Sequence, residues 1–165
     1  MSEPTIEAMI ERMAAQLRER ISAKGNVAMV GIHTGGVWVA EQLHQRLALD
    51  KPLGTLDISF YRDDFTRIGM NPQVRPSDLP FAVDDRHIIL VDDVLHTGRT
   101  IRAAMNELFD WGRPASITLA VLIERSGREL PIEAGVIGQH MDLGTDQHVK
   151  LNGPSPLSLE VLEHP

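Results

Sequence analysis

Residues 87–100 read HIILVDDVLHTGRT, and this stretch decides the fold. The continuous apolar run up to Val91 predicts a buried strand, and the acidic pair Asp92-Asp93 follows it. Thr97-Gly98 then forms a tight turn, after which apolar residues from Ile101 to Phe109 recur with a helical period of 3.6. Gly112 and Pro114 end that helix. The stretch therefore predicts a strand, two adjacent carboxylates, a turn and an amphipathic helix in succession.

The turn between this strand and helix has the chemistry of an anion site. Backbone N–H groups and the positive end of the helix dipole face outward there, so a phosphate binds well. The carboxylates of Asp92 and Asp93 lie just upstream and can accept hydrogen bonds from paired hydroxyls or hold a divalent metal. A phosphorylated sugar fits both features.

Other interpretations of the stretch fit less well. An isolated Asp-Asp pair after a strand is usually an ordinary strand end, but here fourteen residues agree with one arrangement. The chain has no G-x-x-x-x-G-K-[ST] motif and no G-x-G-x-x-G after a strand. An aspartyl-phosphate enzyme would want a second acid where Val94 stands.

Composition sets the broad class. A chain of 165 residues with 42% hydrophobic residues is expected to form one domain, residues 1–165, with a proper core. Cysteine is absent, which rules out disulfides and thiolate chemistry. The expectation is a soluble, cytoplasmic protein without membrane attachment. The net charge of −7 gives no general attraction to nucleic acid.

The rest of the chain alternates between predicted helices and strands, which favours an α/β fold with a mainly parallel, twisted sheet flanked by helices. Residues 62–80 have no helical period and are predicted to be a flexible lid loop. Ligands bind beyond the carboxyl ends of such strands, so the site is expected between the strands that end at Ile32 and Val91. The other predicted elements are helices from Thr5 to Ile21 and from Val37 to Leu47, and strands Val27–Ile32, Thr55–Tyr61, Ser116–Ile123 and Gly135–His140, with one or two edge strands in His148–Leu151 and Leu157–Leu162.

The 87–100 stretch resembles the phosphoribosyl-pyrophosphate (PRPP) signature of type I phosphoribosyltransferases. That resemblance implies that Asp92 and Asp93 hold the ribose hydroxyls and that the following loop wraps the 5′-phosphate. It also implies a pyrophosphate loop after the first strand, and we predict a cis peptide bond there, at His33–Thr34 or Thr34–Gly35. The PRPP-binding residues so implied are Asp92, Asp93, Val94, Leu95, His96, Thr97, Gly98, Arg99 and Thr100, and the pyrophosphate-binding ones are His33, Thr34, Gly35, Gly36 and Arg62.

Further segments are similar to the PyrR family of pyrimidine-operon regulators and uracil phosphoribosyltransferases: Asp57–Asp64, Gly112–Ala115 and Arg128–Ile132, within a match from about Thr5 to Leu151. Membership implies transfer from PRPP to uracil, giving UMP and pyrophosphate, with Mg²⁺ held largely through PRPP beside Asp92 and Asp93. It implies a homodimer or higher homo-oligomer and a small base-binding hood. The catalytic residues implied are Arg62, Asp92 and Asp93, and the base-binding ones are Arg125, Val136 and Ile137. His96 is added to the catalytic residues because purine-type relatives carry at its position an Asp that can take a proton from the base.

Three departures from the family pattern bear on function. His33-Thr34-Gly35-Gly36 replaces Lys-Thr-Arg-Gly, His96 replaces a Tyr, and Gly127 replaces a His in a stretch associated with messenger-RNA binding. We therefore expect specific RNA binding to be weak or absent. The alternatives are an RNA-binding attenuator that senses UMP with little turnover, and a phosphoribosyltransferase for another nucleobase. An RNA-binding face would draw on Arg12, Arg18, Arg20, Lys24, Arg125 and Arg128.

Overall fold

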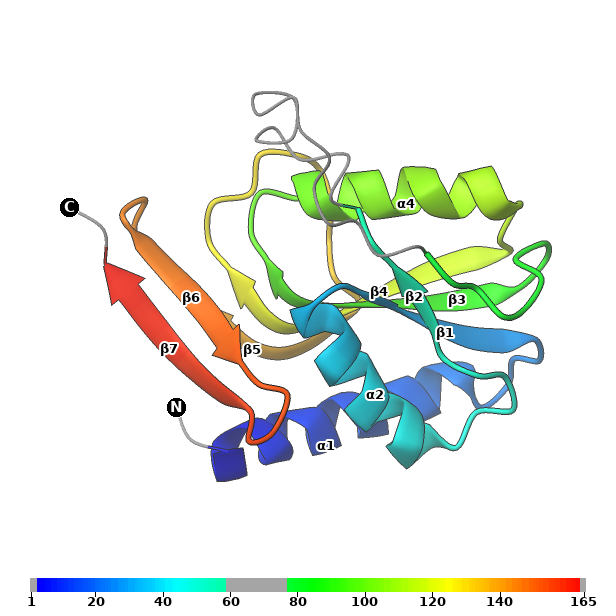
Figure 1. Ribbon diagram of the computed structural model, residues 1–165, viewed down its shortest axis with the longest axis horizontal. Coiled ribbons are helices and arrows are strands. Elements are labelled where there is room, and N and C mark those ends of the chain that lie inside the picture. The colour runs from blue at the N-terminus through cyan, green and yellow to red at the C-terminus, as the bar shows by residue number, and fades with distance from the viewer. Residues whose placement is uncertain (1–2, 59–76, 164–165) are drawn as a thin grey trace.

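The computed structural model describes residues 3–58 and 77–163 of the chain (Figure 1). Helices and strands alternate through most of this length, and a pair of strands ends it. In chain order the elements are α1 (Glu3–Ile21), β1 (Val27–Ile32), α2 (Gly35–Leu47), β2 (Gly54–Leu56), β3 (His87–Leu95), α4 (Arg99–Trp111), β4 (Ser116–Arg125), β5 (Val136–Met141), β6 (Gln147–Asn152) and β7 (Ser158–Glu163).

A five-stranded parallel sheet forms the centre of the molecule, in the order β2-β1-β3-β4-β5. Helices α1 and α2 cover one face, and α4 covers the other (Figure 1). Strand β3 lies in the middle and pairs with β1 on one side and β4 on the other. The predicted α/β class, with a mainly parallel sheet between helices, is confirmed.

The alternation of side chains along β3 explains why this strand is apolar throughout. Ile89 and Val91 point into the core shared with α1 and α2, whereas Ile88 and Leu90 point into the core shared with α4. All four are at most 2% exposed. A parallel strand with helices on both faces must be apolar at every position, so its sequence shows no alternation.

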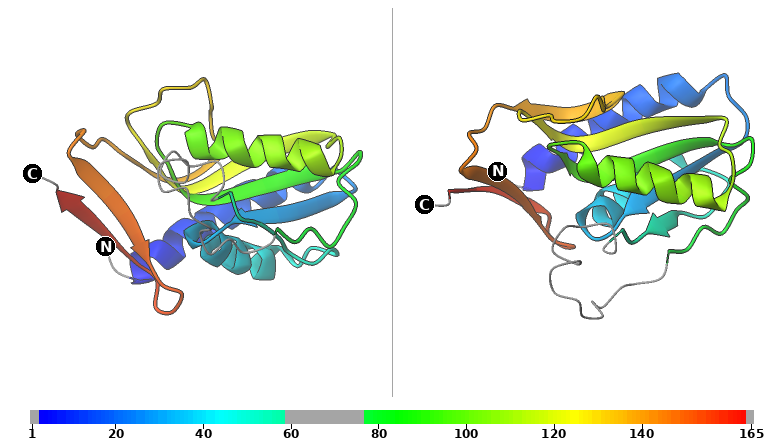
Figure 2. Two further views of the ribbon diagram at one scale, coloured as in Figure 1. Left: turned by 45° about the horizontal axis from the view of Figure 1, so that its top comes forward. Right: turned by 90° about the horizontal axis from the view of Figure 1, so that it is seen from above.

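The last two strands form a separate two-stranded antiparallel sheet, β6 with β7. This hairpin lies beside one end of the main sheet, as two further views show (Figure 2). Leu151, Leu157 and Leu159 fix it there, because they are buried in the core that contains α1 and α2. The prediction of one or two edge strands at the C-terminus is confirmed, and the structure shows that the two strands pair with each other in a sheet of their own.

Two other boundaries differ from the sequence prediction. Strand β3 continues beyond Val91 to Leu95, so the acidic pair lies within it. Strand β2 ends at Leu56, and of the predicted strand Thr55–Tyr61 only the start forms one among the described residues.

The predicted lid, residues 62–80, lies outside the described residues except at its end. There the prediction extended too far, because Asp78 pairs with Thr55 through two backbone hydrogen bonds of 2.7 and 2.9 Å. Leu79 is also buried in the core, at 6% exposure. Residues 77–80 therefore belong to the body of the molecule.

Among the described residues, no helix is long and apolar enough to cross a membrane.

Candidate active site

Two loops meet at the carboxyl end of the central sheet. One joins β1 to α2 and contains His33 and Thr34, and the other joins β3 to α4 and contains residues 96–98. Strands β1 and β3 are neighbours in the sheet, so the two loops that follow them are adjacent. The peptide bond His33–Thr34 is cis, at one of the two positions predicted for it.

The glycines of the first loop bring its backbone against the acidic pair. A Cβ atom on Gly35 would lie 2.2 Å from Oδ2 of Asp93. A Cβ atom on Gly36 would lie 2.8 Å from the carbonyl oxygen of Val91 and 3.0 Å from Cα of Asp92. The distances of 2.2 and 2.8 Å are shorter than real Cβ contacts, so a side chain at either position would force its neighbour to move, and glycine allows the approach without that movement. The structure therefore brings together the two loops that sequence analysis assigned to pyrophosphate and ribose.

The two carboxylates are held by the backbone around them. Oδ1 of Asp92 accepts a hydrogen bond of 2.8 Å from the amide of Asp93, and Oδ1 of Asp93 accepts one of 2.8 Å from the amide of Val94. Asp92 is only 5% exposed, whereas Asp93 is half-buried. Each carboxylate is thus oriented before any ligand arrives, which is what recognition of a rigid diol requires.

The donor set fits Mg²⁺ held mainly by a substrate. Among the described residues, no three His, Cys, Asp or Glu side chains come together as a metal site. Asp92 and Asp93 supply two adjacent carboxylates, and Mg²⁺ is commonly bound by one or two carboxylates together with waters and substrate phosphates. These two residues are the ones that would hold it.

The second loop surrounds a small cavity in front of α4. The cavity is lined by Val94, Leu95, His96, Thr97, Gly98, Thr100 and Ile101. Gly98 has φ of +98°, in the left-handed region that favours glycine. The amide of Arg99, which was expected to face an anion, instead donates to Oγ1 of Thr97 at 3.1 Å. The amides of Thr97 and Gly98 donate to no described residue, so both are available to a ligand.

His96 lies against Gly127, where a Cβ atom would come within 2.8 Å of Nε2 of the imidazole. Burial lowers the pKa of His96 below its usual 6.5, and the nearby charges of Arg125, His148 and Arg128 lower it further, while Glu129 opposes them. These effects favour the neutral form of the imidazole. Two departures from the family pattern, His96 and Gly127, thus occupy one site.

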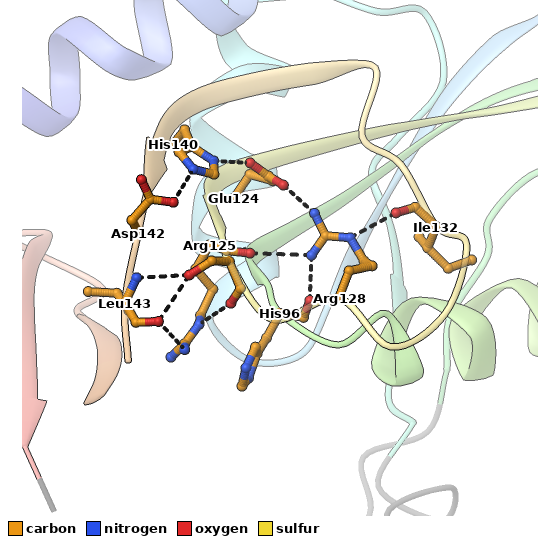
Figure 3. A network of polar contacts seen from close by, with 9 residues as sticks. His96, Glu124, Arg125, Arg128, Ile132, His140, Asp142 and Leu143 are labelled. Atoms are coloured by element: carbon orange, nitrogen blue, oxygen red, sulfur yellow. Dashed lines mark hydrogen bonds and ion pairs between the residues drawn. The ribbon is translucent and has the colours of Figure 1, made fainter. Parts of the chain in front are cut away.

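The chain after β4, residues 126–133, supports the second loop, and sequence analysis did not assign it that role. The carbonyl oxygen of Thr97 accepts hydrogen bonds from the amides of Glu129 and Leu130, at 2.9 and 3.0 Å. Arg128 donates to the carbonyl oxygen of His96 and forms an ion pair with Glu124 (Figure 3). The only signal in the sequence was the family-like run Arg128–Ile132, which carries no indication of these contacts.

The base-binding residues are placed differently from the expectation. Arg125 is 3% exposed, and it donates to the carbonyl oxygens of Gln147, Gly144 and Leu143 at 2.6, 3.1 and 3.4 Å. Its main contacts therefore fix the turn before β6.

Val136 is fully buried in the core beside α1, so its side chain cannot stack on a base. Ile137 pairs with Val121, which pairs with Asp92, so two strand spacings separate it from the acidic pair. A base contact through the Ile137 backbone stays a prediction. Arg62 lies outside the described residues.

The arginines considered for an RNA-binding face are engaged within the molecule. Arg12 and Arg20 each donate, at 3.0 Å, to a carbonyl oxygen of residues 135–138, and Arg18 donates to that of Arg46 at 3.1 Å. Arg125 and Arg128 have the contacts described above. Each of these five arginines therefore uses at least one guanidinium donor inside the molecule.

This fold and site define the type I phosphoribosyltransferase class. The phosphoribosyl transferase domain family matches residues 2–148. Solved structures agree on the fold: a hypoxanthine phosphoribosyltransferase from Staphylococcus aureus has a TM-score of 0.69 at 20% identity, covering 86% of this chain and 75% of that one. A Trypanosoma cruzi hypoxanthine phosphoribosyl transferase has a TM-score of 0.70 at 22% identity, covering 86% and 76%.

Sequence relatives narrow the class. A protein of Nitrosococcus oceani named bifunctional protein PyrR is 60% identical, covering 94% of this chain and 90% of its own. One of Pseudomonas aeruginosa with the same name is 58% identical, covering 97% and 95%. The chain belongs to the PyrR family of phosphoribosyltransferases, as its sequence motifs predicted.

Proposed function

We propose that this protein transfers the 5-phosphoribosyl group of PRPP to uracil, giving UMP and pyrophosphate. The close approach of Gly35 to the carboxylate of Asp93 carries this proposal. It supports one continuous site in which Asp92 and Asp93 accept hydrogen bonds from the ribose hydroxyls. The pyrophosphate then lies along residues 33–36, and the 5′-phosphate lies in the cavity of residues 94–101.

In the reaction the bond from ribose C1 to the pyrophosphate oxygen breaks, and a bond from C1 to uracil N1 forms. Positive charge develops at C1, and negative charge develops on the leaving pyrophosphate. The residues of this chain contribute chiefly by positioning the ribose and stabilising charge. Mg²⁺, when bound, supplies positive charge beside the pyrophosphate and ribose oxygens. Arg62, outside the described residues, is proposed to cover the site and stabilise the leaving group.

Uracil N1 loses its proton as the new bond forms, and His96 is the group proposed to accept it. The lowered pKa of His96 supports this role, because a base must be unprotonated before it acts. His96→Gln is expected to lower kcat while leaving the Kd for PRPP unchanged. A kcat equal to that of the parent protein would show that His96 does not accept the proton.

The decisive experiment is pyrophosphate release in the presence of PRPP, Mg²⁺ and each nucleobase in turn. Release with uracil and not with hypoxanthine, guanine or adenine is the expected result. Pyrophosphate release with a purine and not with uracil would support the alternative function, a phosphoribosyltransferase for another nucleobase. Binding of UMP without release from any base would support the attenuator that only senses nucleotide.

Regulation of pyrimidine genes through RNA is the second candidate function, because the relatives are named bifunctional. We propose that specific RNA binding by this chain is weak, since Gly127 lacks a side chain and the nearby arginines are hydrogen-bonded internally. Titration against leader RNA of its own pyrimidine genes at near-physiological salt tests this. Nanomolar binding that depends on uridine nucleotide would overturn it. We also propose that the protein forms a homodimer or higher homo-oligomer, which its mass in solution would establish.

A further inference from the structure

We propose that Arg128, held by Glu124, is a positioning residue that aims the backbone amides of the 5′-phosphate site. The proposal rests on the function proposed above and concerns how its anion site is built. Arg128 does not itself line the cavity at residues 94–101. It acts on the other side of the same loop.

The guanidinium of Arg128 joins three parts of the molecule. It donates to the carbonyl oxygen of His96 in the loop, to that of Ile132 at 2.9 Å, and to that of Arg125 at 3.3 Å (Figure 3). Its remaining contact is the ion pair with Glu124 at the end of β4. A planar fork with five donors makes such a connection possible, and the point charge of a lysine does not.

The contact with His96 fixes the direction of an amide on the opposite side of the loop. In a trans peptide unit the C=O of one residue and the N–H of the next point in opposite directions. The cis bonds of the described chain are His33–Thr34, Gly153–Pro154 and Ser155–Pro156, so the His96–Thr97 unit is trans. Arg128 therefore pulls the His96 carbonyl toward residues 126–133 and turns the Thr97 N–H toward the cavity.

The next peptide unit is held in the same way. The Thr97 carbonyl accepts from the amides of Glu129 and Leu130, so the Gly98 N–H also points away from residues 126–133. Neither the Thr97 amide nor the Gly98 amide donates to a described residue. Successive N–H groups oriented in this way form an anion-binding concavity. Residues 126–133 are thus the support that shapes it.

Glu124 keeps Arg128 in this position. Its Oε1 pairs with Arg128, and its Oε2 is hydrogen-bonded to Nδ1 of His140. Nε2 of the same imidazole lies 2.9 Å from Oδ1 of Asp142. The side chains of Glu124 and Arg128 are 18% and 24% exposed, so the pair is largely withdrawn from solvent. Both carboxylate oxygens of Glu124 are used, which restricts its rotamer and thereby that of Arg128.

The test measures PRPP binding by calorimetry without a base, together with the KM values for PRPP and uracil. Arg128→Ala and Arg128→Lys are both expected to weaken PRPP binding about tenfold, because losing a hydrogen bond from a charged group costs about 1.5 kcal/mol or more. The KM for uracil should stay within about twofold. Glu124→Gln should move PRPP binding in the same direction. Arg102→Ala, an exposed arginine on α4, is the matched control and should leave every value unchanged.

The lysine variant separates the two roles of Arg128. If the residue served as a cation near the phosphate, lysine would restore PRPP affinity, and that result would overturn the proposal. Unchanged PRPP affinity in the alanine variant would also overturn it. Glu124→Gln keeps a side chain of the same shape, so it tests the proposal through PRPP affinity if the arginine variants do not fold. Because PRPP binding is measured without a base, these outcomes are independent of which nucleobase the parent protein accepts.

Discussion

Replacing Gly35 by alanine tests whether the contact between the first loop and the acidic pair creates the PRPP site. The new Cβ would lie 2.2 Å from Oδ2 and 2.8 Å from Cγ of Asp93, so one of them must move. An ordinary contact needs at least 3.4 Å, and the carboxylate must therefore retreat by about 1 Å. A misplacement of about 1 Å at reacting groups can cost about 100-fold in rate.

We therefore expect Gly35→Ala to lower kcat/KM for PRPP about 100-fold, which corresponds to about 2.7 kcal/mol of transition-state stabilisation. The fold should survive, because Gly35 is the first residue of α2 and alanine favours helix over glycine by about 0.5–1 kcal/mol. Steady-state kinetics with uracil in excess measures the first effect, and thermal unfolding measures the second.

Gly25→Ala is the matched control, since a Cβ there meets nothing within 4 Å. It should leave both kinetics and stability unchanged. A Gly35→Ala protein with kcat/KM for PRPP within about threefold of the parent would refute the reasoning. It would mean that the acidic pair does not bind the ribose from the position that Asp92 and Asp93 have in the structure.

Three further predictions follow from neighbouring contacts. Gly36→Ala places a Cβ 2.8 Å from the backbone of β3, so urea unfolding should show a loss of about 1–3 kcal/mol, unlike Gly35→Ala. Asp92→Asn and Asp93→Asn should each raise the KM for PRPP about 10- to 100-fold, from the loss of about 1.5–3 kcal/mol of charged hydrogen bonding, with the KM for uracil as the internal reference. Hydrogen bonds that the His140 imidazole donates to the carboxylates of Glu124 and Asp142 raise the pKa of His140 above 6.5. The stability that His140 adds is therefore fully present below about pH 6.5 and is lost as pH rises through the folded pKa, so the deficit of His140→Gln in unfolding experiments should shrink from pH 6 to pH 9.

The central part of the fold was predictable because its signals are local. The apolar run before Asp92 required a strand buried on both faces, and the period of residues 101–109 required a helix behind it. Strand β3 nevertheless extends to Leu95, because pairing with β4 continues through Leu95 and Glu124. No local pattern records how far a neighbouring strand reaches.

The parts of the site that sequence analysis missed depend on contacts between distant residues. Thr97 and Glu129 are joined by backbone atoms, and backbone contacts leave no residue-type signal. Arg125 shows the converse case: the family resemblance implied a base contact, whereas its burial and its carbonyl partners give it a role in holding the turn before β6. Val136 was assigned by family position, and its side chain turned out to face the α1 core.

The two halves of the proposed PRPP site are supported in different ways, and this difference has a consequence for substitutions. At the ribose end, a Cβ on Gly35 or Gly36 would come within 3.0 Å of Asp93 or of the β3 backbone, so we expect a larger residue at either position to displace one of them. At the phosphate end, the loop is held from behind by Arg128, Glu129 and Leu130, and the residues facing the ligand contribute backbone amides. Side chains such as His96 can therefore change without removing the anion site. The family-atypical pair His96 and Gly127 lies at this tolerant end, so we expect substitutions there to affect the reaction with the base more than the binding of PRPP.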